Sequence, residues 1–383
     1  MAVTSPLPRQ QHAKSRKVTV SLTMIVRDEE RNLMACLDSV RGIFDEIVVV
    51  DTGSKDRTKE IALEYGARVV EFAWIDDFAA ARNVSLANAT GDYAFWLDAD
   101  DVIEPPERQK LEALLKALPG DQKHAYVVRC ASDPDLAVKS GHIVVDHVRL
   151  FPLLESVRWT YRVHEQILPS LENLQIPLAW TDITVRHRGY AETGVKERKR
   201  QRDWNILLKE LAEYPNTPFV LYNLGMVFFE RKQWQAALDY LRRSFTNLRE
   251  PPRNESVRRK LFSMIAWTHQ LLGDLEDSLR VCDEGLAVDS EDAELWFRKA
   301  VVHRYRLETG VAEACWHRVL GLRRPQEFCS IDQGIYGHLT RRNLAIIAGE
   351  RGDHAEARKH WQAVLAECPA DPDALRHTEA TAE

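Results

Sequence analysis

The sequence predicts an N-terminal α/β domain followed by an all-α array of helical repeats. Two observations support this division. Up to about residue 190, short apolar runs alternate with helical patterns, as in a parallel sheet covered by helices on both faces. From about Glu192 the strand pattern stops and similar helical units recur. The chain has 383 residues, of which 45% are hydrophobic, so it can form the cores of two domains.

Four strands with helices between them are expected in the first part of the sheet. The expected strands cover residues 18–26, 46–51, 67–74 and 92–100. Helices are expected over residues 29–41, over 58–65 and from about 77. Such a half-sheet is Rossmann-like, and it opens a nucleotide-binding crevice at the carboxyl ends of its strands.

Residues 124–187 show a different pattern. The segments AYVVRC (125–130), HIVVDHVRLF (142–151) and ITVRH (183–187) look like strands, and no long helical pattern separates them. We expect a mixed, partly antiparallel extension of the sheet here.

The helical region opens with a basic segment, KERKRQRDW (196–204). A solvated helix face is the first interpretation of this charge run, and binding of phosphate or of an acidic acceptor is the alternative. Four repeat units then start near residues 218, 259, 293 and 338. Small residues such as Gly225, Ala266 and Ala357 would let paired helices approach closely, and stacking of the units would bury their apolar faces.

The strongest chemical signal is the motif LDADD (97–101), which follows the apolar run YAFW (93–96). In an extended segment alternate residues point to the same side, so Asp98 and Asp100 are expected to converge. Two carboxylates at a strand end suit a hard cation such as Mg²⁺ or Mn²⁺. A merely solvated acidic loop is the alternative, and the buried run before the motif disfavours it.

A second signal is VVVDTGSKDRT (48–58). Asp51 is expected at the carboxyl end of a strand, where its carboxylate can accept hydrogen bonds from a base imide or a ribose hydroxyl. Gly53 and Ser54 suit a tight turn, and Asp56 is expected to cap the next helix. A plain strand–turn–helix would explain Asp56 fully but Asp51 only poorly.

Composition narrows the class of protein and its compartment. The formal net charge of −6 disfavours a nucleic-acid partner. No apolar run approaches the ~20 residues of a transmembrane helix. Residues 1–17 lack the apolar core of a secretory signal and are expected to form a disordered leader. The six cysteines form no CxxC pair, which indicates a reducing compartment, the cytoplasm.

Four motifs in order resemble the family 2 glycosyltransferases, which have the GT-A fold. They are SLTMIVRDEERNL (21–33), DEIVVVDTGSKDRT (45–58), FAWIDDFAAARNVSL (72–86) and GDYAFWLDADD (91–101). The resemblance covers about the first 190 residues, and the nearest subgroups are similar to lipopolysaccharide-core β-glucosyltransferases and prophage-type peptide S-glycosyltransferases. The later units resemble tetratricopeptide (TPR) repeats over roughly 150 residues.

The resemblance implies a nucleotide-sugar site whose residues carry over by position. The residues that bind the nucleotide sugar would be Val26, Glu30, Asp51, Arg82 and Asp98. The divalent metal, Mn²⁺ or Mg²⁺, would be held by Asp98, Asp100 and His187. Two alternatives stay open at this point: Arg82 as a surface residue of its helix, and His187 as a buried core histidine.

A catalytic carboxylate is implied within WTYRVHEQI (159–167). Glu165 would be the base that takes a proton from the acceptor nucleophile. The alternative interpretation is that Glu165 only pairs with Arg149 or Arg162. The neighbouring His164 could position the acceptor or a phosphate.

The resulting prediction is a cytoplasmic, metal-dependent, inverting glycosyltransferase that uses a UDP-sugar and modifies a peptide or protein side chain. A saccharide or lipid-linked glycan, such as lipopolysaccharide core, is the alternative acceptor. The non-enzymatic alternative is a TPR scaffold with an inactive GT-A domain. The repeats could bind the acceptor or another protein, or serve only for dimerisation. Expected limits are 1–17 for the leader, 18–190 for the GT-A domain, 191–217 for a linking helix and 218–375 for the repeats.

Overall fold

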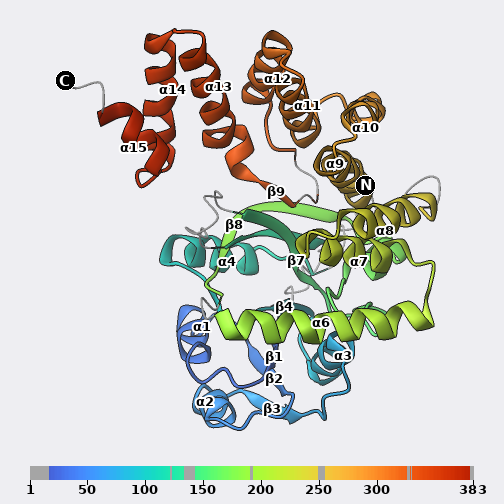
Figure 1. Ribbon diagram of the computed structural model, residues 1–383. Helices are drawn as coiled ribbons and strands as arrows, with labels where there is room; N and C mark the ends of the chain where they lie inside the picture. Colours follow the sequence, from blue (N-terminus) through green and yellow to red (C-terminus); the bar gives the residue numbers. More distant parts are fainter. Residues whose placement is uncertain are drawn as a thin grey trace, which may run out of the picture.

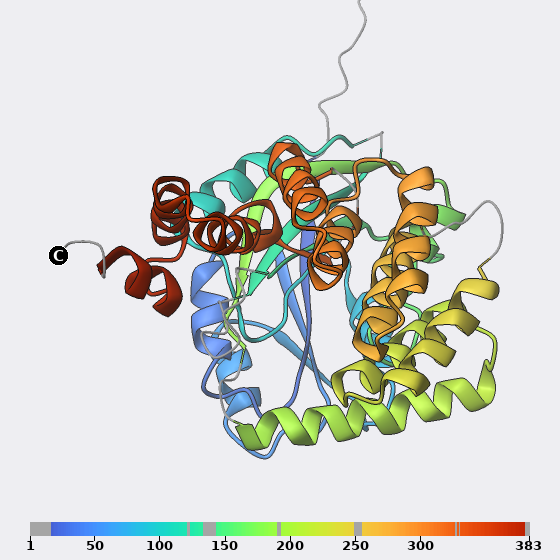
Figure 2. The same cartoon turned by 45° about the horizontal axis from the view of Figure 1, so that its top comes forward.

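The computed structural model describes residues 17–120, 123–132, 143–189, 193–248, 255–325, 328 and 330–379. Apart from Lys17, the expected leader lies outside these residues. A sheet-based domain is followed by paired helices that lie along one side of it (Figures 1 and 2). The predicted order, an α/β domain and then an all-α array, is confirmed.

The strands of the described chain form a single mixed sheet. They are β1 (Val20–Val26), β2 (Glu46–Asp51), β3 (Arg68–Glu71), β4 (Tyr93–Trp96), β5 (Asp101–Val102), β6 (Ala125–Ser132), β7 (Ile143–Pro152), β8 (Leu178–His187) and β9 (Ser330–Asp332). Their order is β3-β2-β1-β4-β7-β6-β8-β5, with β9 paired to β7. The first four strands pair in parallel, whereas β7 pairs antiparallel with β4 and with β6. Both predicted parts of the sheet, the parallel half and the mixed extension, are therefore present.

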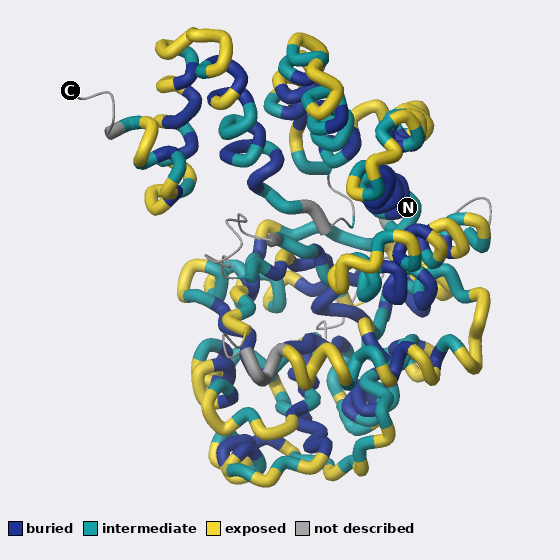
Figure 3. Tube along the Cα trace, in the orientation of Figure 1, coloured by how far each residue is buried: buried dark blue, intermediate teal, exposed yellow. Residues whose placement is uncertain are grey.

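Both faces of the central strands are buried, and side chains of β4 and β6 alternate between two cores (Figure 3). On β4, Tyr93 and Phe95 enter one core, and Ala94 and Trp96 enter the other. The first face is covered by α1 (Leu33–Ser39), α2 (Thr58–Glu64) and α4 (Pro105–Lys116), and the second by α3 (Phe78–Asn88) and α5 (Leu168–Asn173).

The strand expected over residues 92–100 is shorter than predicted. β4 ends at Trp96, and the amide of Asp101 then donates to the carbonyl of Asp98 across a turn (3.1 Å). The carboxylate of Asp101 accepts from the amide of Asp98 (2.9 Å), so this aspartate closes the turn with its own side chain. The extended geometry expected for Asp98 and Asp100 is therefore wrong, although both residues lie just beyond the end of β4.

Two further differences concern helices. Helix α1 begins at Leu33 rather than at residue 29, and a turn precedes it in which the amides of Asn32 and Leu33 both donate to the carbonyl of Glu29 (3.0 and 2.9 Å). Helices α4 and α5 were not predicted. Two prolines, Pro105 and Pro106, open α4 and preset its first turn, so this helix had a local signal that the strand–helix pattern obscured.

The helical region is built of antiparallel pairs, as the repeat pattern predicted. A long helix, α6 (Thr193–Glu213), precedes them. The pairs are α7 (Pro218–Glu230) with α8 (Trp234–Thr246), α9 (Glu255–Leu272) with α10 (Leu275–Val288), α11 (Ala293–Tyr305) with α12 (Thr309–Gly321), and α13 (His338–Glu350) with α14 (His354–Glu367), followed by α15 (Pro372–Glu379). A Cβ atom on Gly225 would lie 2.8 Å from Cγ of Leu241, so this glycine does permit the close approach of α7 and α8. Among the described helices, none has both the length and the apolar character that crossing a bilayer requires.

The repeats return to the sheet between α12 and α13. Strand β9 pairs antiparallel with β7, and Arg324 forms an ion pair with the buried carboxylate of Asp146 on β7 (2.5 Å). Phe328 packs against Trp180 of β8 (5.2 Å between ring centroids). This excursion explains why the last unit starts late relative to the usual repeat length.

Candidate functional site

Two pockets meet at the carboxyl ends of the parallel strands. The larger, which we call the crevice pocket, has a volume of about 890 Å³. Its lining comes from the end of β1 and the loop after it, the Asp98–Asp100 turn, the loop at residues 163–165, His187 and α6. A crevice at this end of a parallel half-sheet is where nucleotides bind in such folds. Val26, Glu30, Arg82, Asp98, Asp100 and His187, all predicted site residues, line it.

Asp51 is buried at the end of β2, and only one of its two carboxylate oxygens accepts hydrogen bonds from the described residues. Its Oδ1 accepts hydrogen bonds from the amides of Gly53 and Ser54 (both 3.0 Å). Its Oδ2 is buried and has no hydrogen-bond partner among the described residues. Buried carboxylate oxygens are normally paired, so Oδ2 has room for one further donor, although Asp51 itself does not line the crevice pocket. Thr52, the next residue, lines the crevice pocket.

The loops after β1 and β2 are tied together beside the crevice pocket. Asp28 has a positive φ of 53°, and its carboxylate accepts from the amide of Lys55 (2.7 Å). The carboxylate of Glu30 accepts from the amide of Arg57 (3.2 Å), and Asp56 accepts from the amide of Glu30 (3.0 Å). Glu30 therefore shapes the wall of the pocket as well as lining it.

Arg82 connects two of the predicted acidic residues. Its guanidinium is 2.8 Å from Oδ1 of Asp98 and 2.6 Å from Oε1 of Glu165. It stacks on Trp96 and Trp159, with centroid distances of 4.4 and 5.0 Å. The interpretation of Arg82 as a surface residue is therefore wrong, and a buried guanidinium holds both carboxylates in fixed positions.

The alternative pairings considered for Glu165 are also wrong. Arg149 pairs with Asp101 (2.6 Å), and Arg162 pairs with Glu213 (2.7 Å). The contact of Glu165 is with Arg82, at a sequence separation of 83 residues. Local sequence carries no signal for a contact at this distance.

The loop that carries Glu165 is strained and firmly held. Tyr161 and His164 have positive φ values of 68° and 57°, which is uncommon for residues other than glycine. Asn83 donates to the carbonyl of Trp159 (3.0 Å) and accepts from its amide (2.9 Å). Strain of this kind persists only where the surroundings enforce it, and it is often found at functional sites. Asn83 was noted in the sequence only as part of a motif, and its role is to position this loop.

A cluster of acidic residues and a histidine lies next to Arg82. Ligand atoms of Asp98, Asp101 and His187 all lie within 4.8 Å of one another. Asp101 is fully buried, and its Oδ1 is 3.0 Å from Nδ1 of His187. Burial opposes ionisation of Asp101, but Arg149 and His187 outweigh burial and hold the pKa of Asp101 well below its usual range. The sequence interpretation missed both Asp101 and Arg149 in this role, although Asp101 directly follows Asp100.

The carboxylates of the cluster stabilise positive charge. Burial raises the pKa of Asp100 to about 6, and the nearby charges of Asp98 and Asp101 contribute to this rise. The hydrogen bond to Asp101 raises the pKa of His187 to about 9, so the ring is a cation at neutral pH. A divalent ion could take the place of this proton, because it would neutralise the same carboxylates.

The available donor set fits Mn²⁺ or Mg²⁺. Asp101 is occupied by Arg149 and by the amide of Asp98, and it does not line the crevice pocket. Asp98, Asp100 and His187 line it and offer carboxylate oxygens and a ring nitrogen. These donor types suit the expected metal. Asp98 and His187 belong to the close cluster, whose third member is Asp101 rather than the predicted Asp100.

Helix α6 supplies positive charge to the same pocket. Arg198, Lys199 and Arg202 line the crevice pocket, and the guanidinium of Arg202 lies over the ring of Phe78 (4.7 Å). These residues belong to the basic segment for which solvation was the first interpretation. Their location favours the second interpretation, the binding of phosphate.

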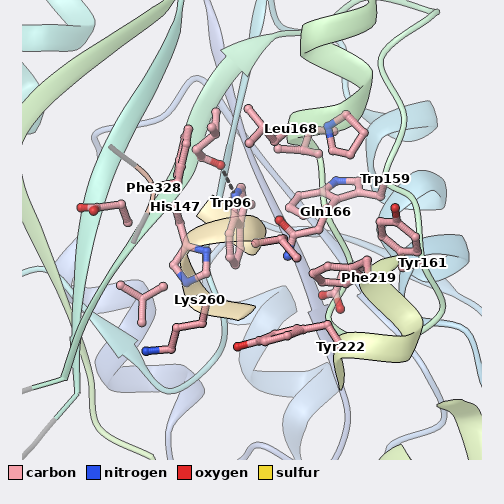
Figure 4. Close-up of a pocket in the computed structure, with 17 residues that line it drawn as sticks. Trp96, His147, Trp159, Tyr161, Gln166, Leu168, Phe219, Tyr222, Lys260 and Phe328 are labelled. Carbon is pink, nitrogen blue, oxygen red and sulfur yellow. Dashed lines mark hydrogen bonds between the residues drawn. The ribbon is translucent and has the colours of Figure 1, made fainter. Parts of the chain in front are cut away.

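A second, smaller pocket lies beyond the Arg82–Trp96–Trp159 layer. This aromatic pocket has a volume of about 190 Å³. Its lining residues come from the sheet domain and from α7 and α9, as Figure 4 shows for Trp96, His147, Phe219, Tyr222 and Lys260. Glu165 lines both pockets. The sequence did not predict this pocket, because its walls come from segments more than 100 residues apart.

The fold and the crevice define a class of protein. A parallel half-sheet with a mixed extension, and an acidic turn after its fourth strand, form a GT-A-like domain. Residues 21–194 match the model for glycosyl transferase family 2, and residues 219–245 match a tetratricopeptide repeat. The chain therefore carries a family 2 glycosyl transferase domain at its N-terminal end, followed by TPR-like helical repeats.

Two curated relatives match parts of the chain. A TPR repeat-containing protein of Synechococcus elongatus is 34% identical over 272 residues, covering 68% of this chain and 64% of the relative. The SPbeta prophage-derived glycosyltransferase SunS of Bacillus subtilis is 28% identical over 244 residues, covering 62% of this chain and 56% of the relative. The matches thus span less than two thirds of either relative.

Solved structures overlap with parts of the chain. One is a thermophilic TPR protein of Thermus thermophilus, which is 20% identical in sequence. The match covers 49% of this chain and 94% of the Thermus chain, with a TM-score of 0.36. Another is glucosyl-3-phosphoglycerate synthase of Mycobacterium tuberculosis, solved with Mn²⁺ and UDP-glucose and 17% identical in sequence. The match covers 51% of this chain and 78% of the synthase chain, also with a TM-score of 0.36.

Proposed function

We propose that this protein is an inverting, metal-dependent glycosyltransferase that moves a sugar from a UDP donor to a peptide or protein side chain. One observation carries the proposal. Glu165 lines both pockets and is linked through Arg82 to Asp98, which lines the crevice pocket. A base between a donor site and an acceptor site is what inverting transfer requires.

In the proposed mechanism, the crevice pocket holds the UDP part of the donor. Asp51 accepts a hydrogen bond from the uracil or the ribose through its unpaired Oδ2, and Val26 and Glu30 flank the base. Asp98, Asp100 and His187 would hold Mn²⁺ or Mg²⁺, which would supply positive charge to stabilise the departing diphosphate. Arg198, Lys199 and Arg202 of α6 add positive charge beside the phosphates.

Glu165 is proposed to accept the proton of the acceptor nucleophile. The nucleophile attacks C1 from the face opposite the diphosphate, so an α-linked donor gives a β-linked product. Arg82 does not perform chemistry in this scheme. It holds Glu165 and Asp98 at fixed positions while Trp96 and Trp159 keep its own guanidinium in place. The presence of all these groups disfavours the inactive-scaffold alternative.

We make two further proposals, one on the domain limits and one on the cellular location. We assign residues 18–190 to the transferase domain, 191–217 to a linking helix that also lines the crevice, and 218–375 to the repeats. We also propose a cytoplasmic location. It is supported by the five described cysteines, Cys36, Cys130, Cys282, Cys315 and Cys368, which are all unpaired.

The test is a panel of nucleotide sugars. The full chain is incubated with each one in Mn²⁺ or in EDTA, and release of the nucleoside diphosphate is followed. We expect UDP release from one UDP-sugar in Mn²⁺ and loss of it in EDTA. Mass spectrometry of candidate peptides and glycans then identifies the acceptor. Absence of diphosphate release from every nucleotide sugar would contradict the proposed function.

A further inference from the structure

We infer that the aromatic pocket is the acceptor subsite, and that it takes a polypeptide side chain carrying a thiol or hydroxyl between apolar neighbours. This inference rests on the proposed transferase function and adds where the acceptor binds and what chemistry selects it. The position of the pocket, its size and the state of its polar groups all support it.

The pocket lies where an acceptor must be. Trp96 and Trp159 form part of its wall, and Arg82 stacks on both rings at 4.4 and 5.0 Å. Arg82 itself lines the crevice pocket, and Glu165 lines both. A nucleophile in the aromatic pocket therefore reaches Glu165 from the side opposite the nucleotide.

The charged groups of the pocket are already paired within the protein, which leaves fewer partners for the hydroxyl groups of a sugar acceptor. Lys260 pairs with Glu294 (2.6 Å), Asp146 pairs with Arg324 (2.5 Å) and Glu165 pairs with Arg82. Burial lowers the pKa of His147 to about 3, so its ring is neutral. A buried sugar has several hydroxyl groups, and each one left without a partner costs about 1–3 kcal/mol.

The apolar lining suits a different ligand. The rings of Tyr161 and Phe219 pack at a tilt with centroids 4.6 Å apart, and Tyr222, Val257 and Phe328 add to the apolar part of the lining. Aromatic pockets of this kind anchor single side chains in protein recognition. A volume of about 190 Å³ is smaller than the ~300–1,000 Å³ of pockets for drug-sized ligands, so it fits one side chain with its immediate flanks.

The repeats make the pocket accessible to a polypeptide. Phe219 and Tyr222 come from α7, and Val257 and Lys260 come from α9, so one wall belongs to the first two repeat units. Figure 4 shows Tyr222 and Lys260 facing His147 and Trp96 of the sheet domain. Stacked helical repeats offer extended surfaces that bind polypeptide. A peptide lying on these helices could insert one residue into the pocket.

The proposed transfer forms one bond at C1 of the sugar and breaks another. The acceptor sulfur or oxygen forms a bond to C1 of the sugar, and the bond from C1 to the diphosphate oxygen breaks. Its electron pair leaves on UDP, and the acceptor proton moves to the carboxylate of Glu165 and then to water. No oxidant or reductant is needed.

The experiment uses the full chain, the UDP-sugar that the wild type hydrolyses, and degenerate heptapeptides with Cys, Ser or Thr fixed at the centre. Sugar addition is read by mass spectrometry. We expect modified peptides with apolar residues beside the nucleophile. Val257→Trp, which fills the pocket, should lower transfer at least tenfold while UDP release without peptide stays within twofold. Phe219→Leu tests the same wall with a milder change in case Val257→Trp does not fold.

Tyr305→Ala is the matched control, because Tyr305 is an aromatic residue of the repeats that is 66% exposed and lies outside the pocket. It should leave transfer unchanged. The inference is overturned if folded Val257→Trp and Phe219→Leu transfer at the wild-type rate, or if no heptapeptide is modified. A wild type that releases no UDP from any donor would instead overturn the proposed transferase function.

Discussion

Arg82 organises the site at the scale of single residues. It joins Asp98 on the donor side to Glu165 on the acceptor side, and it is enclosed by two tryptophan rings. Sequence motifs predicted the site residues Arg82, Asp98 and Glu165 separately. They could not predict that the three form one chain, because the loop of Glu165 is brought in by Asn83 and Trp159 through tertiary contacts.

Glu165→Gln tests the base. The amide keeps the shape of the side chain but cannot accept a proton at neutral pH, so transfer should fall by ~10²-fold or more. UDP affinity should change little, because Asp51 and the metal site hold the nucleotide independently. Transfer rate, UDP affinity and melting temperature are measured on the same variant. Near-normal transfer with reduced stability would show that Glu165 is only a structural partner of Arg82. Glu155→Gln, at an exposed position before the same loop, is the control.

Asp100→Ala tests the metal site. Asp100 lines the crevice, whereas Asp101 is held behind it by Arg149, so the variant should lose Mn²⁺-dependent UDP-sugar turnover and stay folded. Circular dichroism checks the fold, and UDP release checks turnover. Asp182→Ala removes an exposed aspartate outside the pocket and should retain activity. Full activity of the wild type in EDTA would refute the role of the metal.

At the scale of elements, α6 and β9 join the two halves of the molecule. The loop residue Val163, Ile206 and Leu207 of α6, and Val220 and Leu224 of α7 form one buried cluster. The main strands and the repeat helices were predictable because their apolar periodicities are local. Strand β9 was not, since it has three residues and forms only by pairing with β7. The function of α6 in the crevice was also hidden, because a basic helix face looks the same whether it contacts water or phosphate.

Arg324→Met tests the attachment of the repeats to the sheet. Arg324 pairs with Asp146, whose side chain is 2% exposed, and removing the cation leaves a buried carboxylate without it. The free energy of unfolding should fall by about 3 kcal/mol. Arg351→Met, which removes an exposed pair with Glu313, should cost less than about 1 kcal/mol. Urea denaturation measures both, and equal losses would show that the Arg324 pair has no special role.

At the scale of the whole molecule, the proposed donor site belongs to the transferase domain and α6, whereas the proposed acceptor site is shared with the repeats. The crevice is built by residues up to Asp203, while one wall of the aromatic pocket comes from α7 and α9. The domain order was predictable from the sequence, but the shared pocket was not, because it depends on how the two parts pack.

A chain ending at Thr217 tests this division. It keeps α6 and should bind UDP about as well as the full chain, but it should transfer no sugar to a peptide, because Phe219, Tyr222 and Lys260 are gone. Loss of Val220 and Leu224 uncovers Ile206 and Leu207, so solubility has to be checked first. A folded truncated chain that does not bind UDP would show that the repeats help to build the donor site.

The crevice pocket is proposed to bind a nucleoside diphosphate together with a divalent cation. Isothermal calorimetry tests this binding by titration of UDP into the full chain, in Mn²⁺ and in EDTA. We predict one UDP per chain, bound at least ~10-fold more tightly in Mn²⁺ and with this gain lost in Asp100→Ala. Absence of UDP binding, or equal affinity in Mn²⁺ and EDTA, would contradict the account.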